Sequence, residues 1–224
     1  MNSLIVFTKA PVPGKVKTRL CPPLSGEQAA QLYRAFVGDV LTGAHASGAA
    51  TVTLAYETHP DYPDPSWSAD SSAWFPQAGG DLGARLIAAF NETFKTELSK
   101  TVIIGTDCPD LDPHTLSDAF ARLGRADAVV GPANDGGYYL IGLRRPMPHL
   151  FIEMEWSGSK VLQSTLERLR LRGMHFERLP LRSDVDTFED LKALEQRLSE
   201  TEGRALLSRE AIRGLRAQGL FGGQ

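Results

Sequence analysis

Short apolar runs alternate along the chain with stretches of helical periodicity. Four runs rich in β-branched residues have the length and composition of buried strands. They are residues 3–7, 51–56, 101–106 and 127–132. Between these runs, apolar residues recur at a spacing of three and four, which indicates amphipathic helices. The alternation predicts an α/β fold: a single domain with a mostly parallel, doubly wound sheet and helices on both faces.

The predicted helices begin at residues that are suited to capping. Ser25 followed by Gln28 forms a capping box ahead of the first helix. Asp81 can cap the helix that starts at "LGARL", and Thr187 can cap "FEDLKALEQRL". Asp112 stands before a proline, which is well tolerated at the first helical position. These caps place the helix starts directly after the strand-end loops.

The second half of the chain is less regular. We expect an antiparallel strand at "GGYYLIGL" (136–143), a helix at residues 159–173 and a strand at residues 175–181. For residues 199–224 we expect one short basic helix followed by an irregular tail. Residues 1–198 then form the main domain. The sequence contains no internal repeat or linker that would mark a second domain.

Composition and charge narrow the class of protein. The 224 residues are 42% hydrophobic and 23% charged, as in an ordinary globular domain. A net charge of -3 argues against a nucleic-acid-binding protein. The two cysteines, Cys21 and Cys108, lie far apart and outside any metal spacing, which favours a reducing compartment. No stretch has the length of a signal peptide or membrane span, so we expect a cytoplasmic protein with no membrane partner.

A basic loop, "FTKAPVPGKVKTRL" (7–20), follows the first predicted strand. It carries four cations before the first acidic residue of the chain: Lys9, Lys15, Lys17 and Arg19. Pro11 and Pro13 stiffen the loop, and Gly14 permits close backbone approach. Such a frame suits a polyphosphate, because charge-assisted hydrogen bonds to phosphate are strong. It is not a Walker loop, since no Ser or Thr follows the lysine of "GKVK". A solvated basic loop is the alternative.

Carboxylates follow two later predicted strand ends, where ligands bind in open α/β sheets. In "GTDCPDL", Asp107 is the candidate metal ligand, and a plain Asx-turn is the alternative. In "DVDTFEDL", Asp184 and Asp186 alternate on an expected strand end, with Asp186 the better second ligand. Mg²⁺ typically takes one or two carboxylates and completes its shell with water and phosphates. We expect Asp110 to lie next to the site or in a turn, and Cys108 to be a small packing residue.

Two glycine-rich segments also fall at strand ends. Gly79 and Gly80, before Asp81, can pack against a flat base or sugar ring, although a plain turn with a helix cap explains them equally well. Gly136 and Gly137 can let backbone amides approach a substrate. A purely structural hairpin is the alternative for this second pair.

These motifs, in this order, resemble the nucleotide-diphospho-sugar transferase superfamily, which has the GT-A fold. The likeness spans roughly residues 3–197 and rests on "KAPVPGKVKTRL", "GGDLGARL", "IGTDCPDL", "GPANDGGYYLIGL" and "DVDTFEDL". It is greatest to a bacterial family of glycosyltransferase-like proteins linked to arsenosugar or radical-SAM gene neighbourhoods. The chain is more distantly similar to 2-phospholactate guanylyltransferase and molybdenum-cofactor nucleotidylyltransferases.

The resemblance implies an enzyme that takes a nucleotide or nucleotide-sugar and a small-molecule acceptor, with Mg²⁺ or Mn²⁺ as cofactor. It implies phosphate contacts from the basic loop, with Lys15, Arg19 and Asp107 as the catalytic set. The nucleotide-binding residues that we expect are Lys9, Lys17, Gly79, Gly80, Asp81, Gly136 and Gly137. The expected metal ligands are Asp107 and Asp186, with Asp184 as the alternative to Asp186. The irregular second half leaves room for a homodimer.

Two reaction types stay open at this point. In glycosyl transfer, an acceptor attacks the anomeric carbon of a nucleotide-sugar; in nucleotidylyl transfer, an acceptor phosphate attacks the α-phosphorus of a nucleoside triphosphate. The full-length likeness favours glycosyl transfer, which is the activity we predict. The charge of the basic loop favours nucleotidylyl transfer. A non-catalytic nucleotide-binding protein is the third interpretation, because function does not follow from fold.

Overall fold

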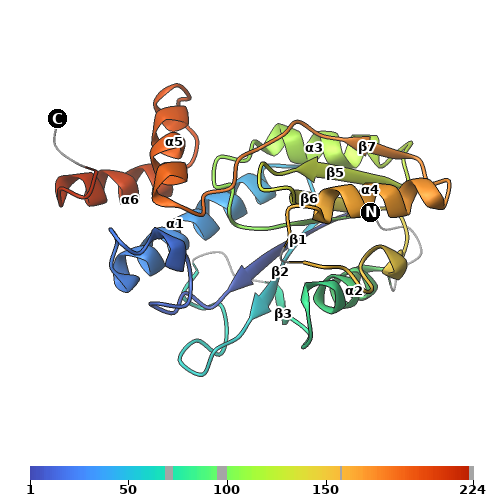
Figure 1. The fold of residues 1–224 in the computed structure, drawn as a ribbon, viewed down its shortest axis with the longest axis horizontal. Coiled ribbons are helices and arrows are strands. Elements are labelled where there is room, and N and C mark those ends of the chain that lie inside the picture. The colour runs from blue at the N-terminus through green and yellow to red at the C-terminus, as the bar shows by residue number, and fades with distance from the viewer. Residues whose placement is uncertain (69–72, 95–99, 157, 222–224) are drawn as a thin grey trace.

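The computed structural model describes residues 1–68, 73–94, 100–156 and 158–221. Within these ranges the strands form a seven-stranded sheet in the order β3-β2-β1-β4-β6-β5-β7 (Figure 1). The strands are β1 (Asn2–Lys9), β2 (Thr51–Glu57), β3 (Trp74–Pro76), β4 (Lys100–Ile104), β5 (Ala128–Pro132), β6 (Tyr138–Leu143) and β7 (Phe176–Arg178). Strand β6 is antiparallel to β4 and β5, and the other neighbours pair in parallel. The predicted α/β sheet with an antiparallel strand in the second half is confirmed.

The helices follow the strands as the sequence pattern predicts. They are α1 (Gly26–His45), α2 (Leu82–Thr93), α3 (Pro113–Arg122), α4 (Val161–Leu171), α5 (Phe188–Ser199) and α6 (Leu206–Ala217), with short 3-10 turns η1 (Thr18–Leu20) and η2 (Pro148–Leu150). The capping box at Ser25 is present, and Asp81, Asp112 and Thr187 each cap the predicted helix. Within the described ranges, no helix combines the length and the apolar character needed to cross a bilayer.

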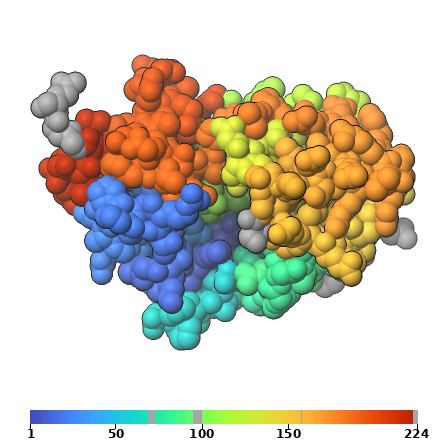
Figure 2. Space-filling model, viewed as in Figure 1, coloured from blue at the N-terminus to red at the C-terminus, as the bar shows by residue number. Residues whose placement is uncertain are grey.

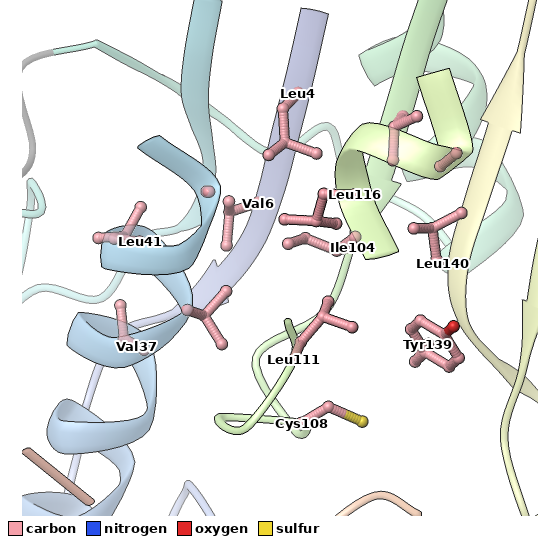
Figure 3. Packing of buried hydrophobic residues seen from close by; sticks show 14 of the residues in the cluster. Leu4, Val6, Val37, Leu41, Ile104, Cys108, Leu111, Leu116, Tyr139 and Leu140 are labelled. Atoms are coloured by element: carbon pink, nitrogen blue, oxygen red, sulfur yellow. The ribbon is translucent and has the colours of Figure 1, made fainter. Parts of the chain in front are cut away.

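The core has a layer on each face of the sheet because side chains alternate along every strand. Leu4 and Val6 of β1 pack with α1 and α3, whereas Ile5 packs with α2 and α4 on the opposite face. Figure 3 shows the first layer, with Val37 and Leu41 of α1 and Leu116 of α3 over Leu4, Val6, Ile104 and Leu140. Cys108, 3% exposed, belongs to the same cluster, which agrees with a packing role.

A third apolar cluster joins α5 and α6 to the outer side of α1, at one end of the molecule (Figure 1). Its polar anchor is Asp39 of α1, which is 9% exposed. The Asp39 carboxylate accepts hydrogen bonds from the backbone N–H of Leu207 and from both the N–H and the hydroxyl of Ser208. It therefore caps α6 from a neighbouring helix, where a carboxylate suits the helix dipole.

The "NDGG" turn before β6 packs closely against the approach to α4. Gly136 has a φ of +88°, and the N–H of Leu162 donates to its carbonyl oxygen at 2.9 Å. A Cβ added at Gly136 would lie 2.0 Å from the carbonyl oxygen of Ser159. Only glycine therefore fits this position, for reasons of backbone conformation and space.

Gly136→Ala is expected to lower the free energy of unfolding by about 3 kcal/mol, because the new Cβ meets backbone at a strained φ. Gly79→Ala is the matched control. A Cβ there would have no neighbour within 4 Å, so we expect a change within about 0.5 kcal/mol. Urea denaturation of both variants measures the difference. Equal stabilities would contradict a structural role for Gly136.

Candidate active-site cleft

A cleft of 590 Å³ lies at the carboxyl ends of β1 and β4. Figure 2 shows the surface hollowed between the blue N-terminal segment and the green to orange segments that face it. Its walls come from the end of β1, the basic loop, the start of α2 and the turn after β4, and Asp186 completes it. The strand order brings these segments together, because β4 pairs directly with β1. The cleft is thus where ligands bind in open α/β sheets.

Lys17 lies at the centre of one wall. Its ammonium pairs with Asp107 Oδ1, donates to the carbonyl oxygen of Val185 at 2.6 Å and lies 3.4 Å from Asp186 Oδ1. The Lys17 side chain is 5% exposed, whereas those of Asp107 and Asp186 are 47% and 38% exposed. Burial alone would lower the pKa of Lys17, but the two carboxylates outweigh it and raise this pKa above its ordinary value. The buried amine is therefore charged.

The other three cations of the basic loop also line the cleft. Arg19 Nη1 lies 3.4 Å from Asp186 Oδ2, and its side chain is 69% exposed, so this pair contributes little to stability. Lys9 and Lys15 line the same wall, and Lys15 is exposed to solvent. The cleft therefore presents cationic side chains, of which Lys15 is solvent-exposed, beside the carboxylates of Asp107 and Asp186.

The floor of the cleft contains polar groups that the sequence pattern did not identify. Tyr33 of α1 accepts a hydrogen bond from the N–H of Lys9 at 2.8 Å, and burial raises the pKa of its phenol well above the ordinary value. Thr106 Oγ1 lies 3.5 Å from the same phenol oxygen. Thr8 is 1% exposed, and within the described residues its hydroxyl has no hydrogen-bond partner. An unpaired buried hydroxyl in a cleft wall suits contact with a ligand.

Gln77 and Arg85 brace the opposite side. Gln77 Nε2 donates to the carbonyl oxygens of Thr8 and Ala55, at 3.0 and 2.9 Å, and so ties the ends of β1 and β2 together. Arg85 pairs with Glu57 Oε2 at 2.8 Å and donates to the carbonyl oxygen of Gly80 at 3.2 Å. This network fixes the glycine turn ahead of α2. Its signal in the sequence is weak, because each contact joins residues from different elements.

The predicted site residues divide into two groups. Those that line the cleft are Lys9, Lys15, Lys17, Arg19, Gly80, Asp81, Asp107 and Asp186. Those outside its lining are Gly79, Gly136, Gly137 and Asp184. The Asp81 carboxylate also caps α2 by accepting from the N–H of Ala84 at 2.8 Å. Asp110 pairs with Arg197 of α5 at 2.9 Å, so it serves the fold around the site.

Asp184 and Asp186 differ from the expected strand-end pair. Residues 183–186 form no strand, so the alternation of a pleated strand does not apply to them. Asp186 contacts Lys17 and Arg19, whereas Asp184 Oδ1 accepts a hydrogen bond from Cys108 Sγ at 3.0 Å. Burial, with nearby negative charge, raises the pKa of Asp184 to about 6. Across the described ranges, His, Cys, Asp and Glu side chains form no group of three or more that could hold a metal.

The model of a family described as "uncharacterized protein conserved in bacteria (DUF2064)" matches residues 40–158. The chain belongs to the DUF2064 family. A search of curated proteins finds no match. A crystal structure from Desulfovibrio desulfuricans G20, provisionally described as a nucleotide-diphospho-sugar transferase, is 33% identical, with a TM-score of 0.88 over 96% of this chain and 95% of that one. The predicted fold class is confirmed.

Two more distant structures share the fold of this DUF2064 protein. Rv0371C from Mycobacterium tuberculosis H37Rv, solved with manganese, is 16% identical, with a TM-score of 0.56 over 88% of this chain and 99% of that one. CMP:2-keto-3-deoxy-manno-octonic acid synthetase, solved with CTP, is 12% identical, with a TM-score of 0.53 over 89% and 98% of the two chains. At these identities the likeness establishes architecture alone.

Asp184→Asn is expected to stabilise the protein at pH 8 and to have little effect near pH 4. The folded-state pKa of about 6 lies above the ordinary 3.8, so the folded state binds the proton more tightly and charged Asp184 costs stability above pH 6. Asparagine removes that cost, which we expect to be about 2 kcal/mol. Thermal unfolding across this pH range, with EDTA present, measures the effect.

Asp190→Asn is the control, because it is expected to lower the stability of the protein at pH 8 rather than raise it. Burial would raise the pKa of Asp190, but hydrogen bonds from Thr187 and Asp186 outweigh it and lower this pKa. Charged Asp190 therefore stabilises the fold above its ordinary pKa, and the benefit is lost as pH falls through the lowered value. A loss of stability at pH 8 in Asp184→Asn would show that the burial argument is wrong.

Proposed function

We propose that this protein is a transferase that uses a nucleotide-activated substrate, with the polyphosphate bound in the cleft against Lys15, Lys17 and Arg19. The observation that carries the proposal is the meeting of the basic loop with Asp107 and Asp186 at one cleft. Cations that converge on a solvent-accessible cleft match a multiply charged phosphate chain. The substrate is a nucleotide-sugar in the first candidate, and the acceptor is a small molecule.

The relatives support the nucleotide-sugar. The 33% identical protein that this chain matches over 96% of its length is provisionally described as a nucleotide-diphospho-sugar transferase. The motif likeness to glycosyltransferase-like bacterial proteins points the same way. In this reaction the acceptor oxygen attacks the anomeric carbon, and the nucleoside diphosphate leaves with the bonding electrons. Lys15 and Arg19 would offset the charge that develops on the leaving phosphate, which is electrostatic stabilisation.

The carboxylates fit a divalent cation. Asp107 and Asp186 are half-exposed, and Oδ1 of each contacts the ammonium of Lys17, so these two oxygens already converge on one position. Two carboxylates completed by water and phosphate oxygens is the usual Mg²⁺ arrangement. Asp107 and Asp186 would hold Mg²⁺ or Mn²⁺, and the manganese complex of Rv0371C lends support from the same fold. When bound, the ion would supply charge neutralisation at the phosphates.

Nucleotidylyl transfer is the second candidate. Its specific support is the number of cations that line the cleft, because a triphosphate carries more charge than a diphosphate linked to a sugar. The fold shared with a synthetase solved in complex with CTP agrees with it. In this reaction the acceptor phosphate attacks the α-phosphorus and pyrophosphate leaves. Neither reaction needs a protein nucleophile, and Cys108 is unsuited to be one, because burial and neighbouring carboxylates raise the pKa of its thiol.

Thermal shift against a panel of NTPs, NDPs and NDP-sugars, each with Mg²⁺ or Mn²⁺, tests the proposal. A nucleotide-sugar at 100 times its Kd should stabilise the protein by about 2.7 kcal/mol. A response to triphosphates but not to nucleotide-sugars would select nucleotidylyl transfer instead. Absence of any response across the panel would refute both candidates.

Asp107→Asn is expected to remove the metal-dependent part of the shift, since it takes away one of the two charged oxygens at the proposed cation position. Asp112→Asn is the matched control. Asp112 caps α3 outside the cleft, and asparagine caps a helix about as well. A metal-dependent shift that survives in Asp107→Asn would show that the ligand assignment is wrong.

A further inference from the structure

The ammonium of Lys17 occupies the position that two carboxylates would offer to a metal ion. Its contacts are Asp107 Oδ1, Asp186 Oδ1 and the carbonyl oxygen of Val185. An ammonium group has three N–H donors, and three acceptors surround this one. Lys17 thus satisfies the cluster as a cation would.

Lys17 differs in this respect from its neighbour in the basic loop. Lys15 is exposed, whereas the Lys17 side chain is 5% exposed and directed to the carboxylates. A phosphate group that enters the cleft can contact Lys15 at once. It can engage Lys17 only if the ammonium leaves at least one of its present acceptors.

A divalent cation held by Asp107 and Asp186 would lie beside the Lys17 ammonium. Two cations at contact distance repel each other, and the repulsion is stronger where solvent is largely excluded. The two carboxylates supply two negative charges, which a divalent ion neutralises without help from the lysine. The metal ion and the ammonium therefore exclude each other at these oxygens.

The backbone holds Lys17 in an unusual conformation. Its φ of 48° and ψ of 38° lie in the left-handed region, which non-glycine residues rarely adopt. Such conformations persist where the surrounding structure over-determines them and are common at functional sites. The backbone fixes where the side chain starts, and the flexible four-carbon stem lets the ammonium move while the loop stays in place.

We propose that Lys17 is an exchangeable counter-ion: it pairs with Asp107 and Asp186 in the free protein, and the incoming divalent cation displaces its ammonium toward the phosphates of the substrate. This inference rests on the proposed function. Lys17 acts as a positioning residue, since it keeps two mutually repelling carboxylates together before the metal arrives. A phosphate chain gives the displaced ammonium a new partner, so metal and phosphate bind cooperatively.

Chemical labelling of the wild-type protein tests the exchange directly. Amines are acetylated with an N-hydroxysuccinimide ester, with and without Mn²⁺, and Lys17 is quantified by mass spectrometry against exposed Lys15. We expect Mn²⁺ alone to raise the acetylation of Lys17 relative to Lys15 about fivefold, because the ammonium leaves its three acceptors. If Lys17 stays protected while electron paramagnetic resonance shows bound Mn²⁺, the exchange does not occur.

Manganese affinity without phosphate provides a second test. Lys17→Met should bind Mn²⁺ about tenfold more tightly than wild type, because no resident cation competes for the carboxylates. Lys15→Met, the matched control, should change the affinity less than about threefold, since an exposed charge is screened. The gain should vanish in Lys17→Met combined with Asp107→Asn. Unchanged or weaker binding by Lys17→Met, or no binding by any variant, would overturn the proposal.

The two tests separate this inference from the function on which it rests. Neither uses a nucleotide, and labelling needs no variant, so it gives a result even if Lys17→Met does not fold. A protein that releases Lys17 to Mn²⁺ but ignores every nucleotide would refute the proposed function alone. A protein that binds nucleotides while Lys17 stays protected would refute the exchange alone.

Discussion

The contact of the Lys17 ammonium with Asp107 and Asp186 joins three parts of the chain that are far apart in sequence. The basic loop after β1 provides Lys17, the turn after β4 provides Asp107, and the segment before α5 provides Asp186. Two carboxylates brought this close would repel each other without a cation between them. A backbone hydrogen bond from the N–H of Val185 to the carbonyl oxygen of Asp107, at 2.9 Å, also joins the segment before α5 to the turn after β4. The cleft exists because these segments are fixed here.

Hydrogen bonds and an ion pair in the neighbouring elements hold this contact in place. Asp186 precedes the capping box of α5, and its N–H donates to Asp190 Oδ2 at 3.2 Å. The Arg197–Asp110 pair ties α5 to the turn after β4. On the other side, Gln77 joins the ends of β1 and β2. The residues that hold ligand-facing groups are thus themselves held by hydrogen bonds, which is what preorganised electrostatic stabilisation requires.

Local patterns in the sequence predict local features of the structure well. Strand runs, helix caps and the placement of the basic loop and Asp107 near one another follow from periodicity, capping chemistry and the topology of parallel sheets. The sequence does not reveal the tertiary contacts, which join residues that are far apart in the chain. Tyr33 fits the apolar face of α1, and only the approach of Lys9 reveals its hydroxyl as part of the floor. Asp184 lies in an irregular segment, and its partner Cys108 is 76 positions away.

We expect one cleft to bind both a divalent cation and a phosphate chain. A crystal structure of the protein soaked with Mn²⁺ and inorganic pyrophosphate tests it most directly, because manganese gives an anomalous signal and pyrophosphate requires no knowledge of the base. We expect a manganese peak coordinated by Asp107 and Asp186, with pyrophosphate against Lys15, Lys17 and Arg19. Manganese and pyrophosphate ordered elsewhere, with Lys17 still between the two carboxylates, would contradict it.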